Sequence, residues 1–378
     1  MRIGLISAAL PPRLDGIGDY TARLAVELAH ENHVTVWTGA DGPVDPLPGV
    51  TIRPSFQPLR PASCRRLCRA VQAEPPDWLV LQYSPFSFGP RGFNLHLPLA
   101  LRGLRRRCPG LRQAIMVHEP FVPSTSLKFR MMATYQRLQL ALLGRGADLV
   151  SFSVERWAAR YRHWFPGRRV AHLPVGSCIP DTGRGEGAVP PTRGVTLGFF
   201  GTAHASRLLD YTAAAASAVR EAGHLRGVLY LGPDAAAVRG SLAGLPLETP
   251  GALPGPEVSC RLREIDLYLA PFVDGVSTRR TSLMAALQHG RAVLGTRGEL
   301  TDSILARRHG SALVLTDAGD IGRFAAAAVE LAARRSERER LGEAAESLYR
   351  REFDWPVIAG RLRSLLEGEP PPAGGAEP

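Results

Sequence analysis

The sequence predicts an α/β protein made of two Rossmann-like, doubly wound domains that follow one another along the chain. It opens with an apolar strand over residues 2–7, a helix over 19–30 and a second strand over 33–39. Such an order is typical of a parallel sheet with helices on both faces. The same pattern restarts at residues 195–201, after a stretch rich in Gly, Pro and charge. The length of 378 residues also favours two hydrophobic cores over one.

The first predicted domain covers residues 1–178. Short apolar runs predict further strands at residues 51–56, 77–83, 113–119 and 147–153. Apolar residues at helical spacing predict helices at 61–73, 97–107 and 127–143.

The second predicted domain covers residues 195–352 and follows a linker at 179–194. The linker lacks hydrophobic periodicity and is rich in Gly and Pro. Strands are expected at 195–201, 227–232, 266–272, 292–296 and 312–316, and helices at 208–222, 234–242, 256–263, 283–289, 317–334 and 336–351. A last helix is expected over 353–368, and the composition of 369–378 predicts a disordered tail.

Basic residues are unevenly distributed along the chain, whose formal net charge is +11. Nearly all of this charge is arginine, because Lys128 is the only lysine. Arg65, Arg66 and Arg69 form one cluster, and residues 101–112 form a second. A solvated helix face, an anionic membrane surface and nucleic acid are three possible explanations. Nucleic acid ranks last, since we find no nucleic-acid-binding motif and no interleaved aromatic residues.

Composition and motifs also limit the cofactors and the location. The five cysteines are scattered and have no matched Cys or His pair, so neither a zinc site nor a disulfide framework is expected. No Asp-x-Asp metal motif is found. No apolar run reaches the length of a membrane helix, and the N-terminus leads straight into a strand without a signal-peptide pattern. A cytoplasmic protein is therefore expected.

The most informative stretch covers residues 266–296, where a polar loop joins a buried strand to an apolar helix. Gly290 suits the left-handed end of that helix. Free backbone N–H groups and the positive end of the helix dipole favour an anion at such a loop, and arginines strengthen the preference. The alternative is a simple helix cap with solvated arginines. The predicted phosphate-binding residues are Ser277, Thr278, Arg279, Arg280, Thr281 and Ser282.

Two further candidate sites lie in the first predicted domain. Gly16 and Gly18 are expected in a loop before the first helix, where a ligand could approach the backbone closely. The loop lacks the dinucleotide fingerprint, because the third glycine position holds Thr21. His118 lies at the C-terminal end of the strand predicted at residues 113–119, the end that faces the ligand crevice in open α/β sheets. It could bind a sugar hydroxyl, or it could simply satisfy a strand-end turn.

Together, these features resemble the GT-B glycosyltransferases and, more narrowly, the family-4 retaining enzymes. The matching segments are the Gly16–x–Gly18 loop, His118, HLPVGS (172–177), FFGTAHASR (199–207), LYLAPFVDG (267–275), ALQHGRAVLGT (286–296) and Phe353–Trp355. The resemblance implies a GT-B fold in which the last helix crosses back to the N-terminal domain. It also implies that the first domain holds the acceptor and the second holds the nucleotide sugar.

The resemblance further implies the reaction and the roles of residues. A sugar would pass from a UDP- or GDP-linked donor to an alcohol acceptor with retention of configuration and without a metal or cofactor. His118 and Asp274 would be the catalytic residues, with His118 in contact with the transferred sugar. Arg207 would bind phosphate, and Gly16 and Gly18 would contact the donor phosphates or the acceptor. The donor motif is a variant, because Ser282 or Ala285 stands where the family has its second glutamate.

The sequence leaves several alternatives open. The basic stretches favour an anionic or lipid-linked acceptor and contact with the inner face of a membrane. A sugar-nucleotide epimerase of related fold is one competing function. A catalytically degenerate GT-B binding protein is another, and the missing glutamate favours it.

Overall fold

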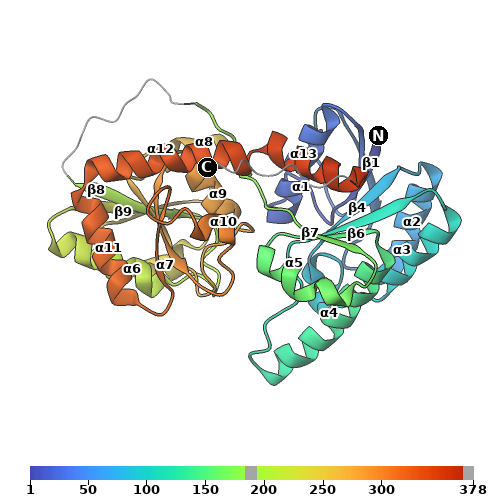
Figure 1. The fold of residues 1–378 in the computed structure, drawn as a ribbon, viewed down its shortest axis with the longest axis horizontal. Helices are drawn as coiled ribbons and strands as arrows, with labels where there is room; N and C mark the ends of the chain where they lie inside the picture. The colour runs from blue at the N-terminus through green and yellow to red at the C-terminus, as the bar shows by residue number, and fades with distance from the viewer. Residues whose placement is uncertain (184–193, 369–378) are drawn as a thin grey trace. The chain divides into compact units, whose positions relative to one another are not determined.

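A computed structural model describes residues 1–183 and 194–368 (Figure 1). The chain forms two compact units. Unit 1 contains Met1–Pro174 and the segment that starts at Trp355, and unit 2 contains Val175–Asp354. Part of the predicted linker and the predicted tail, residues 369–378, lie outside the described residues.

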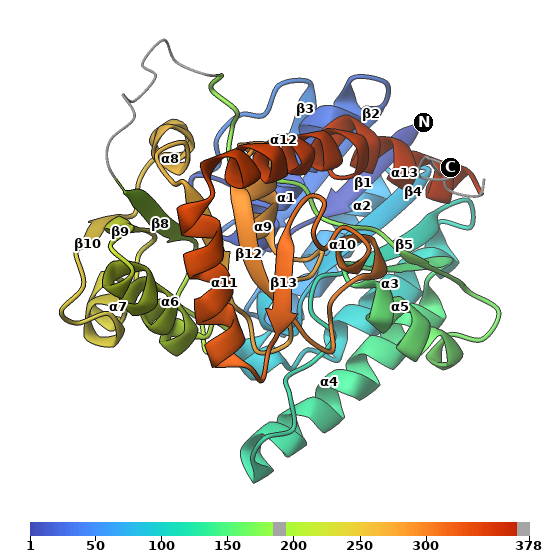
Figure 2. The same ribbon diagram turned by 60° about the vertical axis from the view of Figure 1, so that its left-hand side comes forward.

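Unit 1 is built on a seven-stranded sheet in the order β3-β2-β1-β4-β5-β6-β7. All pairings between neighbouring strands are parallel. The strand order reverses between β1 and β4, as in a doubly wound sheet (Figures 1 and 2). The strands are β1 (Arg2–Ile6), β2 (His33–Gly39), β3 (Val50–Phe56), β4 (Trp78–Tyr83), β5 (Arg112–Val117), β6 (Leu149–Phe152) and β7 (Arg169–His172).

The helices of unit 1 pack in three sets. Helix α13 (Trp355–Glu367) packs on α1 (Gly16–Ala29), so the last helix belongs to the first sheet. Helices α2 (Cys64–Ala73), α3 (His96–Arg107) and α4 (Leu127–Gly146) pack in series, while α5 (Glu155–Tyr161) packs on β7. Short 3-10 turns lie at Pro61–Ser63, Pro85–Ser87, Pro90–Gly92 and Arg162–Trp164.

Unit 2 repeats the architecture with a six-stranded parallel sheet in the order β10-β9-β8-β11-β12-β13. Its strands are β8 (Val195–Phe200), β9 (Leu225–Leu231), β10 (Leu247–Gly251), β11 (Leu267–Ala270), β12 (Ala292–Arg297) and β13 (Val314–Asp317). Its helices are α6 (Leu209–Glu221), α7 (Ala235–Ser241), α8 (Gly255–Leu262), α9 (Thr281–Gln288), α10 (Ser303–Ala306), α11 (Ile321–Ala333) and α12 (Arg335–Glu352).

The predicted fold class is confirmed, since two doubly wound sheets are present and the last helix packs in unit 1. Some elements differ from the prediction. Gly16 and Gly18 are not in a loop but in the first turn of α1, because the Asp15 side chain starts the helix before them. Strand β5 ends at Val117, so His118 follows the strand. The short elements α5, β7 and β10 carry weak periodicity and were not predicted.

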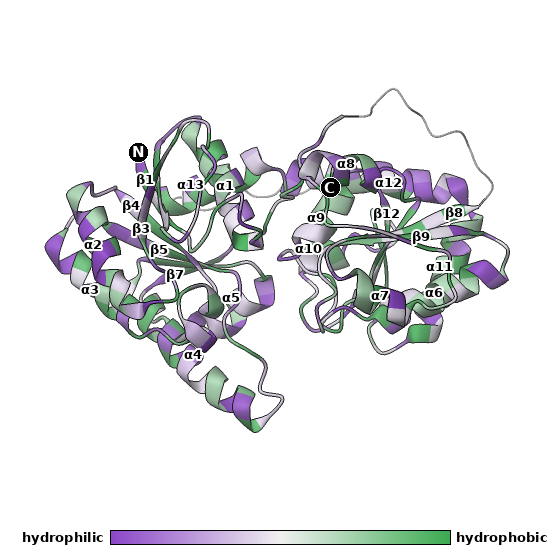
Figure 3. Ribbon diagram, turned by 180° about the vertical axis from the view of Figure 1, so that it is seen from behind, coloured by the Kyte–Doolittle hydropathy of each residue, from purple (hydrophilic) through white to green (hydrophobic). Residues whose placement is uncertain are grey.

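The hydrophobic residues concentrate in the two sheets. Figure 3 shows apolar strands beneath helices whose colour alternates along their length. Strand β4 is buried at every position, as expected for a central parallel strand. No helix in the described ranges combines the length and the apolar character that crossing a membrane requires.

Candidate functional site

The candidate site of unit 2 lies at the point where its strand order reverses. Strands β8 and β11 are neighbours, and the chain leaves them toward opposite edges of the sheet. Ligands of open α/β sheets bind beyond the carboxyl ends of such strands. Here the two loops that follow β8 and β11 are joined by backbone hydrogen bonds. The Val273 N–H donates to Ser206 O at 2.9 Å, and the Leu208 N–H donates to Pro271 O at 3.0 Å.

Two predicted arginines of this site share one carboxylate. Arg279 donates to one oxygen of Asp274 at 2.5 Å, and Arg280 donates to the other at 2.7 Å. All three side chains are more than four-fifths buried. Asp274 therefore holds both guanidinium groups in fixed positions within the loop that joins β11 to α9.

Arg207 brings a third positive charge from the neighbouring loop. It is 6% exposed, and its Nη2 donates to the Phe200 carbonyl at 2.9 Å. Its Nε and Nη1 are buried without a hydrogen-bond partner, and it pairs with no carboxylate in the described chain. Burial lowers the pKa of this guanidinium. A buried cation with unused donors is costly unless an anion meets it.

The ring of Phe272 organises two of these arginines. The guanidinium carbon of Arg280 lies 4.0 Å from the ring centre and that of Arg207 lies 4.8 Å from it. Arg280 also donates to the Ser206 hydroxyl at 3.1 Å. Burial, followed by the charge of Arg279, lowers the pKa of Arg280 to about 10, so it remains protonated at neutral pH. Phe272 and Ser206 were not predicted as site residues.

Helix α9 starts beside this cluster and lacks a side-chain cap. Its first residues, Thr281 and Ser282, are half-buried, and Arg280 occupies the cap position. The Ser282 side chain lies against Gly201, where an added Cβ would meet it at 3.4 Å. Gly201 has φ of 99°, a conformation that favours glycine. The helix N-terminus thus adds free N–H groups and a positive dipole end next to the arginines.

Ser277 and Thr278 occupy a different place from the other predicted phosphate ligands. Both residues belong to the loop and are fully buried. The Thr278 N–H donates to Asp302 at 2.6 Å, and its carbonyl accepts from the Val175 N–H at 2.9 Å. These contacts give Thr278 a role in fixing the loop. Asp302 was not predicted, because its importance depends on a contact between distant segments.

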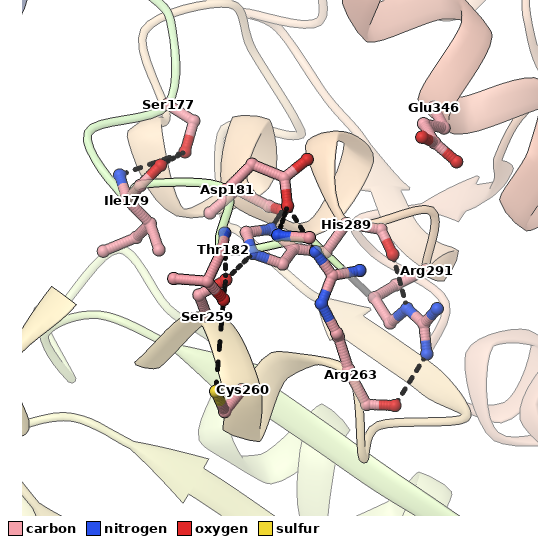
Figure 4. A network of polar contacts seen from close by, with 12 residues as sticks. Ser177, Ile179, Asp181, Thr182, Ser259, Cys260, Arg263, His289, Arg291 and Glu346 are labelled. Atoms are coloured by element: carbon pink, nitrogen blue, oxygen red, sulfur yellow. Dashed lines mark hydrogen bonds and ion pairs between the residues drawn. The ribbon is translucent and has the colours of Figure 1, made fainter. Parts of the chain in front are cut away.

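A polar network fixes the opposite end of α9 (Figure 4). His289 follows the helix, is 2% exposed and hydrogen-bonds to the Ser259 hydroxyl at 2.8 Å. Ser259 in turn contacts the Thr182 hydroxyl at 3.0 Å, and Asp181 pairs with Arg263. The first residues assigned to the linker are therefore bonded into unit 2.

The predicted glycine site of unit 1 already contains a carboxylate. The Asp15 side chain accepts from the N–H groups of Ile17 and Gly18 at 3.0 and 2.8 Å. A Cβ on Gly18 would lie 2.8 Å from the Ala9 carbonyl, whereas one on Gly16 would meet no atom within 4 Å. Gly18 is thus required by close packing, and the α1 amides that a phosphate would use are occupied. Next to them, burial raises the pKa of Asp19 to about 6.

His118 lies at the end of β5, as predicted, and is almost fully buried. Its Nε2 is 2.8 Å from Gln82 Oε1, and its ring meets the edge of Tyr20 at a centroid distance of 4.8 Å. Burial lowers the pKa of His118 to about 3. The imidazole is therefore neutral at physiological pH. It can donate one hydrogen bond and accept another, but it cannot act as a cation. Gln82 and Tyr20 support it and were not predicted.

The comparisons with known proteins agree with this architecture. A scan against family models and a search of curated protein sequences found no match. Solved structures do match along nearly the whole chain. Sucrose-phosphate synthase from Thermosynechococcus elongatus gives a TM-score of 0.73 at 15% identity, covering 97% of this chain and 98% of that chain.

Two other matches have similar coverage. WaaG, a glycosyltransferase involved in lipopolysaccharide biosynthesis, gives a TM-score of 0.69 at 13% identity over 97% of this chain and 100% of that chain. Anabaena HepE in complex with UDP and glucose gives a TM-score of 0.68 at 12% identity, covering 97% of this chain and 100% of that chain. Such likeness establishes the fold, and the chain therefore has the GT-B fold.

Proposed function

We propose that the protein is a glycosyltransferase that moves a sugar from a nucleoside diphosphate donor to an alcohol acceptor. The observation that carries this proposal is the arginine cluster of unit 2. Asp274 is shared by two of its arginines, and Arg207 has no carboxylate partner among the residues that the structure describes. A diphosphate supplies the missing negative charge and accepts the unused guanidinium donors. The GT-B fold and the complex of a similar structure with UDP and glucose add support.

In this proposal, the donor is UDP- or GDP-linked. Arg207, Arg279, Arg280 and the amides of Thr281 and Ser282 bind its diphosphate and stabilise the charge that develops as it leaves. His118 and Asp274 contact the transferred sugar. The family mechanism implied by the resemblance has the donor phosphate assist the incoming hydroxyl, with retention and without a metal. Among the described residues, no cluster of three His, Cys, Asp or Glu could hold a metal ion.

The acceptor is proposed to be anionic or lipid-linked, because the basic stretches predicted from the sequence lie on α2 and α3 of unit 1. A cytoplasmic enzyme that works at the inner face of a membrane fits such an acceptor. The transferred sugar is proposed to be a hexose.

Calorimetric titration with UDP-glucose and GDP-mannose tests donor binding. The double variant Arg279→Ala/Arg280→Ala is expected to weaken binding about a hundredfold or more, since it removes charge-assisted hydrogen bonds. Arg334→Ala/Arg335→Ala is the matched control, because it removes two neighbouring exposed arginines from the same unit. Failure of the wild-type chain to bind any nucleotide sugar contradicts the proposal.

Product analysis separates transfer from the alternatives. Turnover of the donor with an acceptor, giving a product of unchanged anomeric configuration by NMR, supports a retaining transferase. Conversion of the donor without an acceptor indicates an epimerase. Binding without conversion indicates a degenerate GT-B protein. The last outcome is favoured by one observation: Ala285, at the glutamate position of the motif, is fully buried within α9.

A further inference from the structure

Helix α4 has an unusual distribution of polar and apolar residues. Gln136 and Gln139 are completely buried on its inner side. In contrast, Leu127, Met131, Leu138 and Leu142 are exposed by 70, 66, 52 and 40%. The N-terminal end of the helix extends beyond the other elements of unit 1 in Figures 1 and 2. The helix therefore presents apolar side chains where a surface helix normally presents polar ones.

The side chains of Gln136 and Gln139 form hydrogen bonds within unit 1. Gln136 accepts from the Val122 N–H at 2.9 Å, and Gln139 accepts from the Asn94 N–H at 2.6 Å. Gln139 also donates to the Tyr83 hydroxyl at 3.1 Å. Because the inner face is fixed by hydrogen bonds and by buried residues such as Leu140, the outer leucines are not required for packing.

Four of the exposed apolar residues, Leu127, Met131, Leu138 and Leu142, form one stripe, whereas Phe129, which is 38% exposed, lies outside it. The four are spaced at i, i+4, i+11 and i+15, which at 3.6 residues per turn places them within about 60° of one another around the axis. The stripe runs for about 22 Å along the helix, at 1.5 Å per residue. It points away from the buried side, which contains Ala133, Gln136 and Leu143.

Positive charge surrounds this stripe. Lys128, Arg130, Arg137 and Arg145 are exposed on α4, and the helix contains no acidic residue. The neighbouring α3 and α2, which pack in series with α4, also contain arginines and no acidic residue. An apolar stripe whose only charged neighbours on the helix are cations is the pattern of a helix that lies in a membrane interface.

We propose that α4 binds the surface of an anionic lipid bilayer, with Leu127, Met131, Leu138 and Leu142 inserted between the lipids. The lysine and arginines that flank the stripe would meet the lipid phosphates. Pairing with α4 of a second copy would bring the same positive charges together, which opposes self-association. Nucleic acid would satisfy the charges and leave the stripe exposed. The proposal rests on the membrane-side acceptor of the proposed function. It is independent of the donor chemistry proposed for unit 2, which calorimetry with nucleotide sugars tests separately.

Flotation of the full chain with vesicles tests this surface. The wild type is expected to bind vesicles of phosphatidylcholine mixed with phosphatidylglycerol and to lose affinity as salt rises. Leu127→Ser/Leu138→Ser should lower the partition coefficient at least tenfold. Leu14→Ser/Leu59→Ser is the matched control, because these leucines of unit 1 are 88 and 54% exposed and lie outside α4. Circular dichroism and thermal unfolding verify that both variants fold.

Lys128 provides a second measurement, since it is the only lysine of the sequence. Its labelling by an amine reagent, followed by peptide mass spectrometry, should slow at least fivefold on anionic vesicles and be unchanged on phosphatidylcholine alone. The proposal is overturned if the wild type does not bind anionic vesicles or if the stripe variant binds them as tightly as the control. It is also overturned if the stripe supports only self-association in light scattering, or only nucleic-acid binding.

Discussion

The guanidinium group of Arg280 donates a 2.7 Å hydrogen bond to the carboxylate of Asp274, six residues earlier in the same loop. Arg279 donates to the second oxygen of that carboxylate. The loop thus contains its own anion, which orients two of the arginines proposed to bind the donor diphosphate. Asp274 has two opposing effects there, since it positions the cations and also repels a bound phosphate.

Replacing Asp274 by Asn separates these two effects. The amide keeps the size and one acceptor oxygen, and removes the negative charge. We expect UDP to bind about fivefold more tightly, because loss of a nearby like charge is worth about 1 kcal/mol at a partly solvated site. Sugar transfer should slow more than tenfold if Asp274 contacts the sugar. Calorimetry with UDP and steady-state kinetics measure the two effects, and weaker UDP binding would contradict this account.

Arg207→Met is expected to raise stability while it weakens nucleotide binding. The arginine is 6% exposed, and its Nε and Nη1 have no hydrogen-bond partner within residues 1–183 and 194–368. Removing such a buried charge should raise the free energy of unfolding by about 1 kcal/mol. UDP affinity should fall at least tenfold. Denaturant unfolding and calorimetry on the same protein provide the comparison, and a less stable Arg207→Met protein would show that Arg207 is structural.

His118 should make the stability of unit 1 sensitive to acid. Its folded-state pKa of about 3 lies below its ordinary value of 6.5, so below pH 6.5 the unfolded chain binds a proton that the folded chain does not. The stability is fully present above pH 6.5 and is lost as pH falls. Relative to His118→Gln, the wild type should lose about 2 kcal/mol between pH 7 and pH 4.5. Urea unfolding at both pH values measures this loss, with the exposed His33→Gln as control. Equal losses of stability in the wild type and in His118→Gln would rule out this role of His118.

Gly275→Ala should destabilise the arginine loop. Gly275 has φ of 81°, and an added Cβ would lie 2.3 Å from the Gly298 nitrogen. Strain and backbone displacement should together cost about 3 kcal/mol or more and weaken UDP binding. Gly240→Ala in α7 is the control, because a Cβ there meets no atom within 4 Å. That helical substitution should be stabilising by about 0.5–1 kcal/mol in thermal unfolding.

The alternation of apolar strands and helices was enough to predict both sheets apart from the edge strands β7 and β10, because each pattern depends on burial of consecutive residues along one segment. It did not give the boundaries of elements that depend on a cap. Asp15 extends α1 back to Gly16 by accepting two backbone N–H groups, and the sequence signal of a glycine pair favoured a loop instead.

The site could be predicted only in part, for a related reason. The sequence by itself determined the fold class and the polar loop with Arg279 and Arg280, since these lie within one strand–loop–helix segment. The tertiary structure decided that Arg207 and Phe272 join them, that Asp302 fixes the Thr278 backbone, and that Ser277 is buried. It also decided that the leucines of α4 face solvent. Local patterns record which residues are neighbours along the chain, whereas these contacts form only when distant segments fold against one another.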